Sequence, residues 1–208
     1  MSNRFARSIV AAVLTAAIAG CANEPLVSPT FRAGDVWTFA QGVMVTGPLL
    51  VETRGTPYPD AQSRLDETIV ATMKEAITWS ADARLTTDPA EAASHSMRVI
   101  WTFNSAGGVG GTGQCRNQYQ GGGPMEDGRV SVVVTYCDGE DVLSNVGGRL
   151  GESQGLSDPA FAKLIRQATG ELFRYGGRDR DRPGSGITIG GGMGTFGIGG
   201  GGIGIGGR

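Results

Sequence analysis

Hydrophobic and polar residues alternate over residues 97–103, and this period of two predicts a β-strand with one buried face. A valine-rich run at residues 129–136 predicts a second strand. An acidic turn follows at residues 138–141, and residues 142–150 are its expected hairpin partner. The pattern therefore predicts a single strand followed by a hairpin. The apolar face of the first strand would consist of Met97, Val99, Trp101 and Phe103.

Two other segments have the helical period. Within residues 60–79 an apolar residue recurs every four positions, which is typical of an amphipathic helix. Asp158-Pro159 places a capping residue before a proline and predicts the start of a second helix, which ends at Gly176-Gly177. Each helix would bury one stripe. The stripes are Leu65, Ile69, Met73 and Ile77 in the first, and Phe161, Leu164, Ile165, Ala168 and Leu172 in the second.

The remaining segments are less regular. Residues 36–39 and 43–51 are rich in β-branched residues, and we interpret them as one or two further strands. Residues 104–128 are rich in glycine and poor in apolar residues. A loop of this length is usually either functional or disordered.

The expected order of elements is strand, helix, strand, hairpin and helix. It predicts an α+β fold over residues 35–177, in which a small, mostly antiparallel sheet carries two amphipathic helices on one face. This order is similar to that of the small α/β domain at the N-terminus of the periplasmic protein TolB and in several envelope lipoproteins. The similarity concerns element order and brings no site residues with it.

The first 20 residues have the features of a secretory signal. Arg4 and Arg7 precede an apolar run at residues 9–19, which is too short to span a bilayer. The run ends in Ile18-Ala19-Gly20-Cys21.

This tetrad resembles the lipobox of bacterial prolipoproteins. The resemblance implies cleavage before Cys21 and lipidation of that cysteine, and several acyl chains would make a stable anchor. In lipoproteins of this type an Asp after the cysteine favours the inner membrane. Ala22 occupies that position here, so the expected location is the periplasmic face of the outer membrane. The alternative is an ordinary signal peptide with a cysteine near its cleavage site.

Segments without clear periodicity flank the predicted domain. Residues 21–34 are interpreted as a tether between membrane and domain. Residues 178–182 form a charged linker, and residues 183–208 are a tail in which glycine is interspersed with isoleucine. The tail cannot bury enough surface to offset its backbone entropy, so we expect it to be disordered, or extended when paired with a partner.

Net charge limits the classes of partner. Cleavage would leave 188 residues with 16 basic and 20 acidic side chains. Such a chain lacks the basic surface expected of a nucleic-acid-binding protein. It also has no polybasic cluster for anionic lipid, so the expected membrane contact is the lipid on Cys21 alone.

Cys115 and Cys137 remain once Cys21 is acylated. An even pair in an oxidising compartment predicts a disulfide. Closing a loop of this length would stabilise the fold by about 3 kcal/mol. We expect no metal site and no cofactor, because the chain has no CxxC motif and His95 is its single histidine.

Motifs that suggest catalysis lack the context they require. Residues 151–155 match GxSxG around Ser153, but the histidine of the hydrolase motif should follow the serine, and His95 precedes it. Residues 108–113 and 192–197 match GxGxxG without the strand and helix that a dinucleotide site needs. No catalytic residue is therefore assigned.

The sequence predicts a non-enzymatic, lipid-anchored envelope protein with a structural or accessory role and an envelope protein as partner. One alternative is a ligand-binding module with a hydrophobic pocket beneath the 104–128 loop. Another is an envelope hydrolase, for which Ser153 and His95 would be the only plausible pair.

Overall fold

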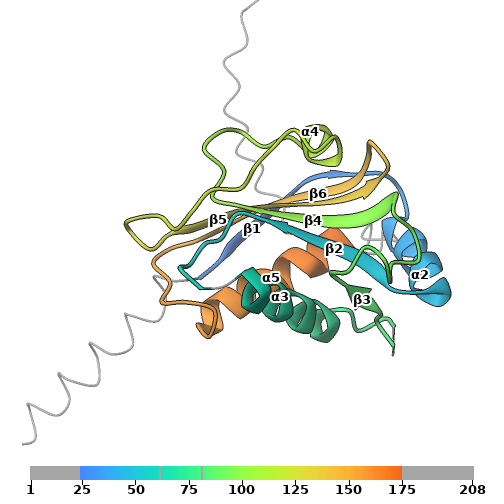
Figure 1. Cartoon of the computed structure of the whole chain (residues 1–208), viewed down its shortest axis with the longest axis horizontal. Coiled ribbons are helices and arrows are strands. Elements are labelled where there is room, and N and C mark those ends of the chain that lie inside the picture. The colour runs from blue at the N-terminus through green and yellow to red at the C-terminus, as the bar shows by residue number, and fades with distance from the viewer. Residues whose placement is uncertain (1–23, 61, 81, 175–208) are drawn as a thin grey trace, which may run out of the picture. The chain divides into compact units, whose positions relative to one another are not determined.

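The structure, a computed structural model, describes residues 24–60, 62–80 and 82–174. Figure 1 shows a twisted sheet with helices α3 and α5 on one side and the segment around α4 on the other. The strands are β1 (Leu26–Arg32), β2 (Leu49–Arg54), β3 (Leu85–Thr86), β4 (Met97–Phe103), β5 (Val130–Asp138) and β6 (Asp141–Leu150). The helices are α2 (Val36–Thr46), α3 (Gln62–Ala76), α4 (Gly111–Cys115) and α5 (Pro159–Leu172).

The six strands lie in the order β1-β6-β5-β4-β2-β3. Strand β2 runs parallel to β3 and β4, and all other neighbours are antiparallel. The predicted α+β fold with a mostly antiparallel sheet is confirmed. The hairpin predicted after residue 129 is β5–β6, and its two strands remain paired from Val130↔Leu150 to Asp138↔Asp141.

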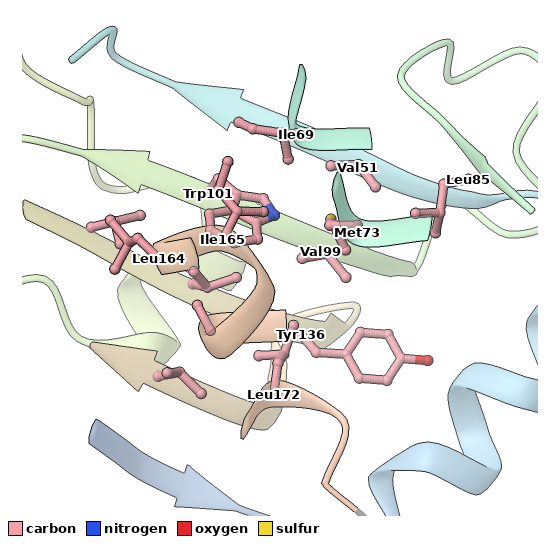
Figure 2. Close-up of a cluster of buried hydrophobic side chains, with 14 of the residues drawn as sticks. Val51, Ile69, Met73, Leu85, Val99, Trp101, Tyr136, Leu164, Ile165 and Leu172 are labelled. Atoms are coloured by element: carbon pink, nitrogen blue, oxygen red, sulfur yellow. The ribbon is translucent and has the colours of Figure 1, made fainter. Parts of the chain in front are cut away.

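The hydrophobic core lies between the sheet and helices α3 and α5, as Figure 2 shows. Val99, Trp101 and Phe103 all face this core, so the period-two prediction for β4 is confirmed. The predicted stripes of both helices are also buried. Aromatic rings strengthen the contact, since Phe161 of α5 lies 6.1 Å from Phe103 between ring centroids.

Residues 36–46 form helix α2, so the prediction of a strand there is wrong. The β-branched and aromatic residues favoured a strand by propensity alone. The buried residues of α2, however, are Val36, Ala40, Val43 and Met44, which recur at helical spacing. Burial of this stripe against the core outweighs local propensity. The second predicted segment, residues 43–51, contains the start of β2.

Residues 26–32 form strand β1, so the prediction of a tether over residues 21–34 is wrong for half of those residues. The segment lacks clear periodicity and contains Pro29, which is unfavourable in a strand because proline cannot donate a ladder hydrogen bond. Here β1 is the edge strand, and its register shifts between Pro29 and Phe31. An edge tolerates proline because one side of the strand has no partner to bond.

Several predicted features lie outside the described residues. These are the signal sequence at residues 1–20, Cys21, the linker at residues 178–182 and the tail at residues 183–208. Among the described helices, none combines the length and the apolar character needed to cross a bilayer.

Two neighbouring glycines of β6 test which face of the sheet is packed. A Cβ on Gly148 would lie 2.9 Å from both Leu164 and Val132, whereas one on Gly147 would meet only the Ser28 carbonyl oxygen at 3.9 Å. Gly148→Ala should therefore destabilise the fold by roughly 1–3 kcal/mol through overpacking. Gly147→Ala should leave stability unchanged or raise it slightly. Urea unfolding of both variants measures the difference, and equal stability would contradict the assignment of faces.

Candidate functional site

The face of the sheet turned away from α3 and α5, here called the outer face, is covered by the 104–128 loop instead of a helix layer (Figure 1). Loop and sheet meet mainly through polar groups. The central one is Gln114 of α4, whose side chain is completely buried. A buried amide is stable only if its donors and acceptor are satisfied.

The sheet supplies those partners. The Nε2 of Gln114 donates to the Thr102 hydroxyl at 2.6 Å and to the Val133 carbonyl at 3.0 Å. Its Oε1 accepts from the Thr135 hydroxyl, which in turn accepts from the Asn145 amide at 2.6 Å. Strands β4, β5 and β6 each contribute one side chain to this network, so α4 has a single position over the sheet.

A disulfide lies beside this network and joins Cys115 to Cys137, as the sequence predicts, with a Cα–Cα distance of 5.6 Å. Both cysteines are buried with Ile100, and the partly buried Val142 packs against them. This small second core fixes the end of α4 to β5. Its role in the structure is to hold the loop on the sheet.

Two buried or half-buried arginines donate to carbonyl groups at the end of α4. Arg98 donates to the Cys115 carbonyl at 2.6 Å, and Arg54 donates to the Gln114 carbonyl at 3.2 Å. Glu52 lies between them and pairs with both, at 3.4 Å and 3.0 Å. The charges of the two arginines are thereby partly compensated.

The later part of the loop reaches the sheet by backbone contact. Gly122 donates to the Phe103 carbonyl at 2.8 Å and accepts from the Thr56 amide at 2.9 Å. A Cβ on Gly121 or Gly122 would lie 2.0 Å from a carbonyl oxygen, so only glycine allows this approach. The glycines that suggested disorder are required for docking in this part of the loop.

Where the loop leaves the outer face open, a groove of about 580 Å³ remains. Its floor consists of two rows that cross the strands. One wall is formed by Ser105 and residues 107–109 at the start of the loop. The first row is Thr102, Val133, Gly147 and Ser28, and the second is Ser131, Arg149 and Leu26.

Arg149 is the only charged residue among those that line the groove. Its cross-strand neighbours are Ser131 and Leu26, and within the described residues no carboxylate lies within 4.0 Å of its guanidinium group. The groove thus combines an exposed guanidinium that has no carboxylate partner with several serine and threonine side chains. Such a lining can bind a ligand that carries an oxyanion.

The structure separates the proposed hydrolase pair. His95 precedes β4 at the end of the sheet where Met97 pairs with Asp138. Ser153 lies at the opposite end, where its amide donates to the Gly128 carbonyl. The length of β5 puts roughly 25 Å between these ends. A nucleophile and its base must come within hydrogen-bond distance, so Ser153 and His95 do not form a catalytic pair.

Ser153 has a structural role instead. Its hydroxyl bonds to Tyr58 at 2.5 Å and donates to Asp158 at 3.0 Å, which caps α5 by accepting from the Ala160 amide. Burial raises the pKa of Tyr58 to about 12. Burial alone would raise the pKa of Asp158, but hydrogen bonds from the Ala160 and Gln154 amides and from Ser153 lower it overall. This cluster ties the start of α3 to the start of α5.

Sequence reasoning missed Gln114 and Arg149. Arg149 was hidden in a segment interpreted only as a hairpin partner, although a polar residue alternating with buried ones on β6 indicates an open outer face. No local pattern marks Gln114, because its partners are distant in sequence. Among the described residues, no group of three or more potential ligands could hold a metal ion.

Comparison with known proteins gives little further information. No model of a protein family and no curated protein matches the chain. The solved PelC dodecamer from Paraburkholderia phytofirmans is similar, with a TM-score of 0.40 and 18% identity over 71% of this chain and 96% of that one. A point variant of the same protein gives 0.41 and 17% over 71% and 97%. The resemblance to TolB in element order stays a prediction.

The Gln114 network can be tested by substitution. Gln114→Leu removes the amide and breaks its hydrogen bonds with Thr102, Val133 and Thr135, so it should destabilise the fold by about 2–4 kcal/mol. Gln118→Leu is the matched control, because Gln118 lies on the same loop and is exposed. Urea unfolding measures both changes. A Gln114→Leu protein as stable as the control would show that the network does not hold the loop.

Proposed function

We propose that the chain is a lipid-anchored protein of the cell envelope that has no catalytic activity and binds partners through its outer face. The proposal is carried by the short distance in sequence between the lipobox cysteine and the folded domain. Cys21 precedes Leu26, the first residue of β1, by only five positions. A fully extended chain of five residues spans no more than about 18 Å.

A lipid on Cys21 would therefore hold the edge strand of the sheet close to the bilayer. The domain would lie against the membrane surface and would not hang from a long tether. Ala22 supports the outer membrane as its location, by resemblance to other lipoproteins. The expected partner is another protein of the envelope, and the glycine-rich tail offers a second segment for that contact.

The arrangement of the outer face supports a binding role. Arg98, Glu52 and Gln114 are engaged in holding the loop, and the serine of the GxSxG match bonds to a helix cap. None of these groups is paired with a base or an oxyanion site as acyl transfer requires. The groove offers hydrogen-bonding groups on a rigid sheet, which suits recognition.

A ligand-binding module is the second candidate, and the groove favours it. A hydrophobic pocket beneath the loop was the expectation. A groove lies beside residues 105–109, and its lining mixes apolar side chains with hydroxyl groups, glycines and Arg149. The polar groups come from the outer positions of β1, β5 and β6.

Substitution of Cys21 tests the anchor. In cells fed labelled palmitate, the wild-type chain should incorporate label and remain in the membrane fraction. Cys21→Ser should incorporate none and should keep the mass of the uncleaved precursor, because both lipidation and signal cleavage depend on that thiol. The double variant Cys115→Ser/Cys137→Ser is the control and should still be labelled, since the disulfide plays no part in processing. Label on the Cys21→Ser protein would contradict the proposal.

A further inference from the structure

We propose that the outer-face groove binds the phosphate headgroup of a membrane phospholipid, with Arg149 holding the phosphate and Leu26 contacting the acyl chain. The inference rests on the lipid anchor proposed above and names a second contact with the same membrane. The sequence predicted no membrane contact beyond the anchor, because the chain has no polybasic cluster. The present proposal adds a contact at one defined site.

The charge of the groove selects an anion. The chain has more acidic than basic residues, yet no acidic residue lines the groove. Arg129, at the same end of the sheet, is already engaged, since it pairs with Asp127. Arg149 is exposed and has no carboxylate partner in the described part of the chain. A guanidinium group binds phosphate through two parallel hydrogen bonds.

The neighbours of Arg149 complete a headgroup site. Ser131 lies directly across from it on β5, and Ser28 and Gly147 lie in the next row. The Ser28 hydroxyl can bond to a further phosphate or headgroup oxygen, whereas the Ser131 hydroxyl donates to Asn104 Oδ1 at 3.5 Å. At Gly147 the floor has no side chain, and a Cβ there would meet nothing closer than 3.9 Å, so the groove keeps its depth.

The position of Leu26 points to a lipid in preference to a soluble phosphate. Leu26 pairs with Arg149 across β1 and β6, and 72% of its surface is exposed. It therefore places an apolar side chain beside the guanidinium, and it is the residue of the groove nearest in sequence to Cys21. With Cys21 at the bilayer surface, Leu26 would lie within about 18 Å of that surface, and Arg149 about 5 Å further along the sheet. A lipid offers a phosphate and an apolar chain together, which matches this pair.

The experiment uses the chain from residue 21 onward with Cys21→Ser, which keeps every described residue and carries no anchor. Amide signals of the ¹⁵N-labelled protein are followed by NMR during titration with dihexanoyl phosphatidylglycerol below its micelle concentration. A parallel titration uses glycerol 3-phosphate, which has the phosphate without the acyl chains. The informative signals are the amides of Gly147, Ser131, Gly107 and Gly108.

We expect the short-chain lipid to shift these signals, and glycerol 3-phosphate to bind at least about 10-fold more weakly, because it lacks the contact with Leu26. Arg149→Gln should weaken lipid binding by about 10-fold or more. Gly147→Val should do the same by filling the groove. Arg129→Gln, which removes an exposed and already paired arginine at the same end of the sheet, should change nothing.

Three results would overturn the proposal. The first is the absence of shifts at these amides up to 10-millimolar-scale lipid, on the order of the weakest specific binding. The second is unchanged affinity in Arg149→Gln. The third is equal binding of glycerol 3-phosphate, which would assign the groove to a soluble organic phosphate. Loss of palmitate labelling in cells would overturn the anchor without altering this titration, so the two failures are distinguishable.

Discussion

The buried side chain of Gln114 is the interaction on which the outer face of this protein depends. It bonds directly to strands β4 and β5, and Thr135 extends the network to Asn145 of β6. The disulfide from the adjacent Cys115 prevents the loop from moving away. A buried amide without partners would cost more free energy than a typical hydrogen bond contributes. We therefore expect either the complete network or a loop detached from the sheet. The open part of the face, which is the groove, exists because the loop stops there.

The two faces of the sheet are buried by different interactions, one by apolar packing and the other by hydrogen bonds. Against α3 and α5 the sheet presents a continuous apolar surface, and Gly148 allows Leu164 to approach the backbone. On the outer face the strands present Thr102, Thr135 and Asn145, which bond to a loop instead of packing against a helix. The rigid inner core holds the strand register, and that register in turn aligns the rows of the groove.

This difference explains how much could be predicted from sequence. Val99, Trp101 and Phe103 revealed β4, and the stripes of α3 and α5 revealed both helices, because apolar periodicity is a local signal. Helix α2 was misread because its β-branched residues favour a strand by propensity, although its buried residues follow helical spacing. Strand β1 was hidden by Pro29, which only an edge position permits. The Gln114 network runs from Thr102 to Asn145, so no short window of sequence contains it.

The proposed function combines two features, the lipid anchor at Cys21 and the groove on the outer face. The edge strand begins five residues after Cys21, and the groove begins at the same strand. An anchor there would present Arg149 and Leu26 to the membrane while the loop side stays available for a protein partner. Both proposals need a sheet face that is rigid under native conditions.

Hydrogen exchange of backbone amides in the oxidised protein tests that rigidity most directly. The amides of Gln114, Arg116 and Gly122 bond to carbonyl groups of the loop or of β4. If the loop is fixed on the sheet, they should exchange at least about 100-fold more slowly than in an unstructured chain. Exchange at unstructured rates, with the amides of β4 and β5 still protected, would show that the loop moves freely and would contradict the account.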